Sequence, residues 1–244
     1  MRVNKDDVRR GYDDLAPVYA EQRTGDGDGT DILAEFLDSL SASPRVLDAG
    51  CGQGTPILSR LASEADPVGL DFSRGQLSRA AENVPNAPLL QGDMTTLPFE
   101  SNTFDAVVAY WSLIHVPMDD HQTVIDEFAR VLRPGGRVLL CEGSDEWAGE
   151  NPDWLESGVR MEWNIAGADE TRAQLQNAGF RVTDTWGAPE TLNPDEGDGE
   201  DVDAEDADVE TEAEDVDAET EAEEADGDGE DSDPWTFFAA RLAS

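Results

Sequence analysis

A run of three glycines after a short apolar segment limits the possible folds of this chain more than any other feature. The run reads Arg45-Val-Leu-Asp-Ala-Gly-Cys-Gly-Gln-Gly54, and beyond Pro56 the apolar residues Ile57, Leu58 and Leu61 have helical spacing. The sequence therefore predicts a strand, a glycine loop and a helix, because proline is tolerated in a first helical turn, where its missing amide would be unpaired anyway. Such a loop lets backbone amides approach a ligand closely and points them, with the positive helix end, at it.

The glycine spacing and the preceding acid narrow the kind of ligand. Dinucleotide-binding loops follow G-x-G-x-x-G, whereas the third glycine here comes one residue early, at Gly54. The motif D-x-G-C-G-x-G resembles the first motif of class I S-adenosylmethionine-dependent methyltransferases. A carboxylate at Asp48 would repel a pyrophosphate and favour the amino group or sulfonium of a cationic amino-acid ligand. The resemblance implies that Asp48, Gly50, Cys51 and Gly52 bind S-adenosylmethionine; a purely structural turn is the alternative.

Two further acids follow predicted strands in the order that the resemblance implies. The segment Val-Gly-Leu-Asp71-Phe-Ser resembles the family's second motif, in which the acid binds the ribose hydroxyls and Phe72 lies near the adenosine. An N-cap role on the next helix, for Asp71 or Ser73, is the alternative. The later pair Asp93-Met94 resembles the adenine-binding motif, where the acid takes the exocyclic amine and its neighbour packs on the ring. An ordinary turn acid is the alternative there.

Four more side chains are candidates for the site, His115 as a catalytic residue and three aromatic residues, Trp111, Tyr12 and Tyr19, as cofactor-binding residues. His115 follows the fourth predicted strand, at the edge where open α/β sheets bind ligands, and we expect a general base there. The alternative is that His115 orients its loop through a backbone hydrogen bond. Trp111 is expected to wall the site unless it only packs. Tyr12 and Tyr19 lie in a predicted helix, 4–22, that resembles the family's cofactor-covering leader, and core packing is their alternative role.

The charge balance excludes one class of partner. The chain has 56 acids and 16 bases, and 24 of the acids lie in 190–233, so the other 200 residues carry 32 acids against 16 bases. Because nucleic-acid binding depends on Lys and Arg that neutralise phosphates, we expect no nucleic-acid substrate. The acid excess with a single lysine resembles proteins of salt-accumulating halophiles, whose surface charges are screened over about 3 Å at about 1 M salt. An acidic protein from any source is the alternative.

Compartment and redox state follow from what the sequence lacks. No apolar run reaches the roughly 18 residues that span a bilayer, and Met1–Asp7 lacks the apolar core of a signal peptide, so we expect a cytoplasmic protein that does not associate with membranes. Cys51 and Cys141 lie at the ends of strands that a third strand is expected to separate by about 10 Å, too far for a disulfide. With so few cysteines, we expect neither metal binding nor thiol catalysis.

The alternation of strands and helices predicts an α/β protein. The resemblance implies a Rossmann-like, doubly wound sheet of seven strands in the order 3-2-1-4-5-7-6, with strand 7 antiparallel, in a single domain spanning 1–244. We expect 1–41 to form an N-terminal helical cap. Residues 143–168 break the alternation and hold three tryptophans, which suits a substrate lid or ordinary packing. Residues 190–233 are expected to be a disordered acidic insertion between strands 6 and 7, because they hold too few apolar residues to offset ordering entropy.

Together these features predict transfer of a methyl group from S-adenosylmethionine to an oxygen, nitrogen or carbon of a small-molecule acceptor, with His115 as the candidate base. Two alternatives stay open. One is a regulatory protein that binds S-adenosylmethionine without turnover. The other is an NAD-dependent oxidoreductase, which the misplaced third glycine and the carboxylate at the phosphate position disfavour.

Overall fold

A mixed sheet of seven strands, in the order β3-β2-β1-β4-β5-β9-β8, carries the fold. The computed structural model describes residues 3–22, 28–188 and 233–243. The sheet strands are β1 (Arg45–Ala49), β2 (Asp66–Asp71), β3 (Leu89–Gln91), β4 (Phe104–Ala109), β5 (Leu132–Gly143), β8 (Phe180–Ala188) and β9 (Trp235–Leu242). Strand β9 is antiparallel to both of its neighbours, β5 and β8, whereas the other neighbouring strands of the sheet are parallel to each other. The predicted α/β architecture is confirmed; the labels differ from the expected order because an additional hairpin takes two numbers, so that β8 and β9 stand for strands 6 and 7.

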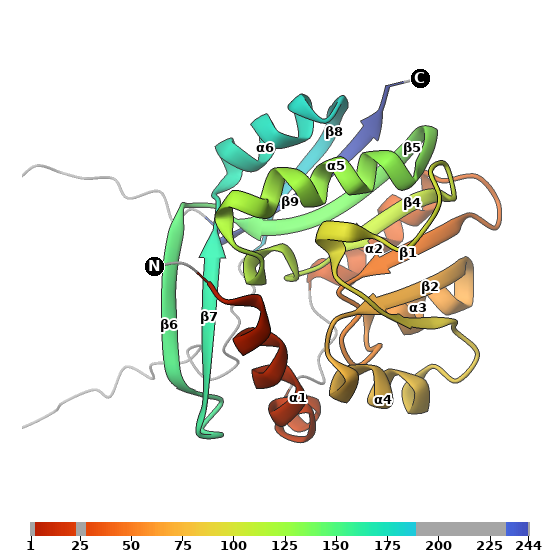
Figure 1. Ribbon diagram of the computed structural model, residues 1–244. Helices are drawn as coiled ribbons and strands as arrows, with labels where there is room; N and C mark the ends of the chain where they lie inside the picture. The colour runs from red at the N-terminus through yellow and green to blue at the C-terminus, as the bar shows by residue number, and fades with distance from the viewer. Residues whose placement is uncertain (1–2, 23–27, 189–232, 244) are drawn as a thin grey trace, which may run out of the picture. The chain divides into compact units, whose positions relative to one another are not determined.

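Helices cover both faces of this sheet (Figure 1). Helices α5 and α6 lie on one face and α2 and α3 on the other, while α4 packs on β2 and β3 and α1 packs on α4. The α-helices are α1 (Lys5–Gln22), α2 (Asp28–Asp38), α3 (Ile57–Glu64), α4 (Arg74–Asn83), α5 (His121–Val131) and α6 (Ala168–Asn177). Short 3₁₀ helices span Met94–Thr96 (η1), Leu113–His115 (η2) and Met118–Asp120 (η3). The carboxyl ends of β1, β2 and β4 therefore meet at one edge, with η1 and η2 beside them.

The core explains why the central strands read as continuous apolar runs. Strands β4 and β5 have parallel or antiparallel neighbours on both sides, and Phe104, Val107 and Leu140 are fully buried. Phe128 of α5 and Phe238 of β9 join the same cluster. Burying a large apolar side chain contributes about 1.5–3 kcal/mol, so this layer fixes the sheet on which the loops at its carboxyl edge are mounted.

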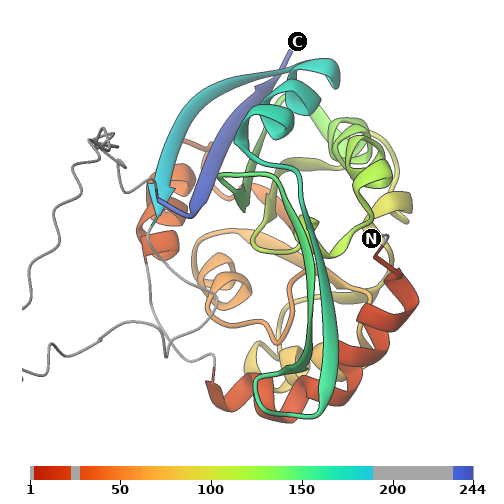
Figure 2. The same cartoon turned by 90° about the vertical axis from the view of Figure 1, so that its left-hand side faces the viewer.

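The expectation of an irregular segment at 143–168 is wrong in its secondary structure. Strands β6 (Trp147–Trp154) and β7 (Val159–Ile165) form a regular antiparallel hairpin, separate from the main sheet. Figure 2 shows this hairpin extending alongside helix α1. The sequence does contain its period-two pattern, since apolar residues alternate with polar ones along Val-Arg-Met-Glu-Trp-Asn-Ile. The side chain of Met161 and the backbone of β7 reach Gly11 of α1, where an added Cβ would lie 2.6 Å from the Met161 sulfur.

Several boundaries differ from the predicted ones. Strand β5 begins at Leu132, and the sequence Pro134-Gly-Gly136, which is typical of a turn, is an irregularity within the strand, with Gly135 at φ +76°. Strand β3 ends at Gln91 rather than at Met94, which belongs to η1. The acidic insertion lies almost entirely outside the described residues, and the proposed division into cap, lid and insertion stays a prediction. Among the helices that the structure describes, none has the length and apolar character needed to cross a membrane.

Candidate functional site

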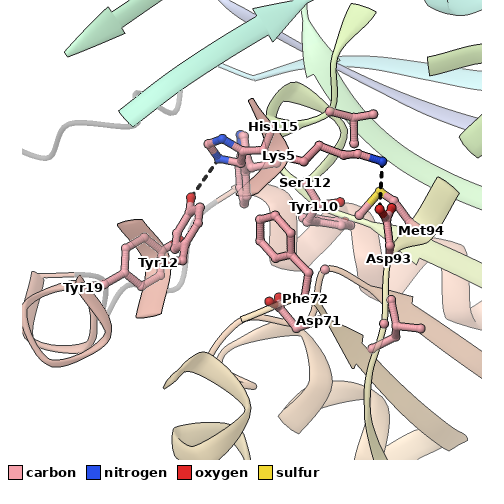
Figure 3. Close-up of a pocket in the computed structure, with 15 residues that line it drawn as sticks. Lys5, Tyr12, Tyr19, Asp71, Phe72, Asp93, Met94, Tyr110, Ser112 and His115 are labelled. Carbon is pink, nitrogen blue, oxygen red and sulfur yellow. Dashed lines mark hydrogen bonds and ion pairs between the residues drawn. The ribbon is translucent and has the colours of Figure 1, made fainter. Parts of the chain in front are cut away.

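A cavity opens at the carboxyl edge of the sheet, between the glycine loop, helix α1 and η2 (Figure 3). It encloses roughly 700 Å³ of unfilled space, including the part open to solvent. Its lining comes from the N-terminal helix, the ends of the strands and the segment after β4: Lys5, Tyr12, Tyr19, Gly50, Leu70, Asp71, Phe72, Gly92, Asp93, Met94, Tyr110, Trp111, Ser112, His115 and Val116. Most of the predicted site residues are thus brought together, whereas Asp48, Cys51 and Gly52 lie outside this lining.

The glycine loop has the backbone that only glycine adopts easily. Gly50 has φ +85°, and a Cβ there would lie 2.3 Å from the Cβ of Ser112. The amide of Gly50 donates to the Leu70 carbonyl over 2.7 Å, which ties the loop to β2. Gly52 also has positive φ, but no heavy atom lies within 4 Å of its added Cβ, so that side of the loop is open. Cys51 instead packs in a small cluster with Leu58 and Val84.

Asp71 connects the glycine loop to the start of α4. Its two carboxyl oxygens accept hydrogen bonds from the amide of Gly52, at 2.9 Å, and the amide of Ser73, at 2.8 Å. Ser73, not Asp71, is the N-cap of α4, because its hydroxyl accepts from the Gln76 amide at 3.1 Å. Burial raises the pKa of Asp71 to about 6, although the backbone hydrogen bonds oppose that rise. The carboxyl keeps lone pairs toward the cavity, and the predicted ribose role stays a prediction.

Asp48 is a buried acid beneath the loop. Its residue is 1% exposed, and its Oδ2 atom has no hydrogen-bond partner among the residues that the structure describes. Burial raises the pKa of Asp48 to about 8, and the negative charge of Asp71 contributes to the rise. At neutral pH the carboxyl of Asp48 is therefore largely protonated in this structure. A cationic group bound near the loop would favour its ionised form.

Lys5 also lines the cavity, next to Asp93, and no local sequence pattern marks it as a site residue. Its ammonium lies 2.8 Å from Asp93 and 3.0 Å from the Thr95 hydroxyl. Asp93 also accepts hydrogen bonds from the amide and the hydroxyl of Thr95, both at 2.8 Å. Burial alone would raise the pKa of Asp93, but the bonds from Lys5 and Thr95 hold it below its ordinary value. Phe72 and Met94 line the same end, as expected for residues near an adenine ring.

His115 and Tyr12 form a hydrogen-bonded pair at the cavity wall (Figure 3). The Tyr12 hydroxyl lies 2.8 Å from Nε2 of His115, and Nδ1 of His115 lies 3.3 Å from the Glu162 carbonyl. Because a carbonyl only accepts, Nδ1 carries the proton and Nε2 accepts from the tyrosine. His115 is 7% exposed, and its imidazole lines the cavity. Both expected roles of His115, as base and as loop anchor, are compatible with these contacts.

Aromatic rings cover the side of the cavity formed by α1 and the hairpin. Tyr12 contacts Tyr19 and Trp154 edge-on, with ring centroids 5.7 and 5.9 Å apart, and Trp163 packs 6.0 Å from His115. Trp154 and Trp163 thus support the wall from behind and do not line the cavity. Trp147 is 50% exposed and also lies outside this lining, and the two alternatives for the segment, substrate lid or ordinary packing, stay predictions.

Trp111 also lines the cavity, and its backbone has φ +45°. It packs against Tyr110 and Phe237, at 5.5 and 5.8 Å between centroids, so it serves both as cavity wall and as part of the packing. The second histidine, His121, is fully buried, and its Nε2 lies 3.0 Å from the Val116 carbonyl. Burial lowers the pKa of His121, which suits a structural role. Within the described ranges no cluster of His, Cys, Asp and Glu could hold a metal ion, and both cysteines are buried.

Known proteins resemble both the sequence and the fold. Residues 46–136 match a family model described as a methyltransferase domain. The demethylmenaquinone methyltransferase of Streptomyces avermitilis is 38% identical over 122 residues, which cover 50% of this chain and 49% of that protein. The protein of the same name from Beutenbergia cavernae is 35% identical over 154 residues, covering 60% and 63%. The chain thus spans about half to two thirds of the length of the relatives it matches.

Among solved structures, the [4+2]-cyclase SpnF has a TM-score of 0.61 at 25% identity, covering 78% of this chain and 77% of that one. A Methanosarcina mazei protein described as an S-adenosylmethionine-dependent methyltransferase has a TM-score of 0.62 at 15% identity, covering 86% and 97%, which supports the fold alone. The matched domain includes the glycine loop, Asp71, Asp93 and His115. Residues 46–136 of this chain thus match a methyltransferase domain, and its seven-stranded α/β fold is shared with a protein described as an S-adenosylmethionine-dependent methyltransferase.

Proposed function

We propose that this protein transfers the methyl group of S-adenosylmethionine to a small-molecule acceptor held between the cofactor and the aromatic wall. The observation that carries the proposal is a cavity that combines the family's cofactor motifs with the Tyr12–His115 pair. When bound, the cofactor supplies a methyl group on a positively charged sulfur.

The cofactor half of the proposal assigns one contact to each motif. The open side of the loop at Gly52, with Asp48 beneath, suits the amino-acid end of the ligand. Asp71, held by two backbone amides, suits the ribose hydroxyls, and Phe72 and Met94 suit the two sides of the adenine ring. Asp93 is the acceptor for the exocyclic amine, and its present partner, the ammonium of Lys5, would share or yield that position.

The acceptor half of the proposal rests on the residues near η2. Nε2 of His115 would take the proton of an acceptor hydroxyl or amine, while the hydrogen bond from Nδ1 to Glu162 keeps the ring oriented. Tyr12 occupies that nitrogen now, so its hydroxyl would move aside or relay the proton. The rings of Tyr12, Tyr19 and Trp111 would exclude water and align the reactants, which is most of what methyl transfer to a good nucleophile requires.

The names of the curated relatives indicate which acceptor to test first. Both relatives compared above are demethylmenaquinone methyltransferases, and a planar ring system would suit an aromatic wall. The likeness to SpnF favours one second candidate, a reaction in this cavity other than methyl transfer. Both candidates predict an aromatic or polyunsaturated organic substrate, and they differ in whether methyl is consumed.

Two measurements test the proposal. Isothermal titration compares S-adenosylmethionine with NAD in molar potassium chloride; we expect binding of the first and none of the second. Transfer of isotope-labelled methyl to demethylated quinones and other aromatic hydroxyl compounds follows, with wild type, His115→Ala and the exposed control Trp147→Phe. Loss of transfer only in His115→Ala supports the assignment. Tight NAD binding would refute it, and cofactor binding without transfer to any acceptor would favour the second candidate.

A further inference from the structure

We propose a second binding site, for a multivalent phosphate-type oxyanion, at the amino edge of the sheet, formed by Arg137, Arg181 and Arg241. These three arginines lie at the opposite end of the strands from the cavity. Gly143, the last residue of β5, is six positions after Arg137, a span of roughly 20 Å at about 3.3 Å per residue. The site is therefore independent of the methyl-transfer cavity.

The register of the sheet places the three arginines in one row. Arg137 of β5 pairs directly with Arg241 of β9, and Arg241 pairs directly with Arg181 of β8. Directly opposed residues of antiparallel strands point to the same face, with Cβ atoms about 4.5–5.5 Å apart. Three like charges are thus side by side on one face, an arrangement that destabilises a sheet unless an anion neutralises it.

Neighbouring groups hold the row in place, and a single acid, Asp184, offsets part of its charge among the described residues. The Arg137 guanidinium stacks on Phe36, 5.4 Å from its centroid, donates to Thr183 at 3.2 Å, and has its Nε buried with no hydrogen-bond partner in the described part of the chain. Arg241 donates through Nε to the Gly135 carbonyl at 3.2 Å, which leaves the outer edge of its guanidinium for another acceptor. For these three arginines, the ion pairs within the described residues reduce to Arg137 with Asp184, at 3.7 Å.

The surface around the row is concave and carries a local positive charge. Arg133 adds a fourth arginine to the lining of this hollow. Among the described residues, the one acid in the lining is Asp105, which pairs with Arg133. Four of the 16 bases of a chain with net charge −40 therefore gather around a single hollow. Electrostatics elsewhere on this protein would repel anions, so the cluster is the place where an anion gains most.

The chemistry of the row favours a phosphate-type ligand. Guanidinium groups present planar pairs of donors that match phosphate oxygens two at a time. A phosphate group concentrates up to about two negative charges in one compact unit, so it can contact adjacent guanidiniums simultaneously, whereas a single carboxylate carries one. Pyrophosphate, with two linked groups, is the simplest probe long enough to reach along the row.

The first experiment measures pyrophosphate binding to the full chain by isothermal titration at constant ionic strength. We expect one site per chain, and Arg181→Gln and Arg241→Gln should each weaken binding about tenfold or more. The matched control is Arg60→Gln, which removes the same charge from an exposed position on α3. Absence of binding to the wild type, an equal loss in Arg60→Gln, or equally tight binding of citrate would overturn the proposal.

A thermal melt separates a ligand site from a merely structural row. Because Arg241 lies between two like charges, Arg241→Gln should raise the melting temperature without pyrophosphate and abolish the stabilisation that pyrophosphate gives the wild type. A structural role predicts the reverse, a lower melting temperature in Arg241→Gln and no effect of pyrophosphate on the wild type, and that result would overturn the proposal. The affinity for S-adenosylmethionine should stay unchanged in Arg181→Gln and in Arg241→Gln, which would show that the two sites are separate.

Discussion

Replacing Asp48 by asparagine should make the protein more stable and a poorer binder of its cofactor. The carboxyl of Asp48 has a pKa of about 8 when folded and an ordinary value near 3.8 when unfolded. Between these values the folded state holds a proton that the unfolded state has lost, so stability falls as pH rises, by about 1.4 kcal/mol per pH unit. Asparagine resembles the protonated acid in shape and does not ionise, so the variant avoids this loss.

The size of the effect follows from the same two pKa values. Relative to the wild type, Asp48→Asn should gain up to about 1.6 kcal/mol at pH 5 and up to about 4 kcal/mol at pH 7. These are upper limits, because water entry and relaxation around a buried carboxyl reduce the cost of its charge. Both proteins would be unfolded with denaturant at several pH values in molar potassium chloride, so that the other charges contribute equally.

An exposed aspartate, Asp66, provides the control variant for Asp48→Asn. Asp66→Asn removes a carboxyl whose side chain is 69% exposed, and it serves as the control for the loss of one negative charge. If Asp48 favours the amino group of the cofactor, Asp48→Asn should also weaken S-adenosylmethionine binding about tenfold. Binding by the wild type near pH 7 should release a proton, visible as a dependence of the titration enthalpy on the buffer. A pH-independent stability difference, or a variant less stable than the wild type at pH 7, would refute the reasoning.

Three further predictions test other parts of the site. Gly50→Ala should lower the free energy of unfolding by about 1–3 kcal/mol, because the φ of +85° and the Ser112 side chain both oppose a Cβ. Gly52→Ala, where the added Cβ has open space around it, should cost less in the same denaturant assay. Tyr12→Phe removes the hydroxyl 2.8 Å from His115, and it should shift the pH profile of methyl transfer while leaving the melting temperature within a few degrees; an unchanged profile would exclude a role in proton transfer. The melting temperature of the wild type should be markedly higher in molar potassium chloride than in dilute buffer, since 56 acids face 16 bases, and equal values would contradict the halophile interpretation.

The cofactor half of the site was predictable because its chemistry is local in the sequence. The glycine loop, Asp71 and the Asp93-Met94 pair each follow directly on a strand, so predicting the strands places their carboxyl ends at one edge. The α/β class followed from the alternation of strands and helices, whereas the order of the strands was implied by the family resemblance alone.

The remaining features depend on contacts between distant parts of the chain. The bonds of Lys5 to Asp93 and of Tyr12 to His115 join residues 88 and 103 positions apart, and no local pattern specifies either pairing. Trp147 and Trp154 belong to the same strand, yet one is exposed and the other buried, because only Trp154 faces α1. The hairpin itself was detectable, since Val159, Met161 and their successors alternate with polar residues.

The hairpin and α1 lie outside the segment 46–136 that matches the methyltransferase domain. Tyr12 and Trp154, which meet across these two elements, can thus change without altering the glycine loop, Asp71 or Asp93. Selection for a new acceptor would therefore act mainly on two peripheral elements, one at the start of the chain and one after β5. Under the proposed function, exchanging the hairpin for that of a relative is expected to change the acceptor while keeping the methyl donor.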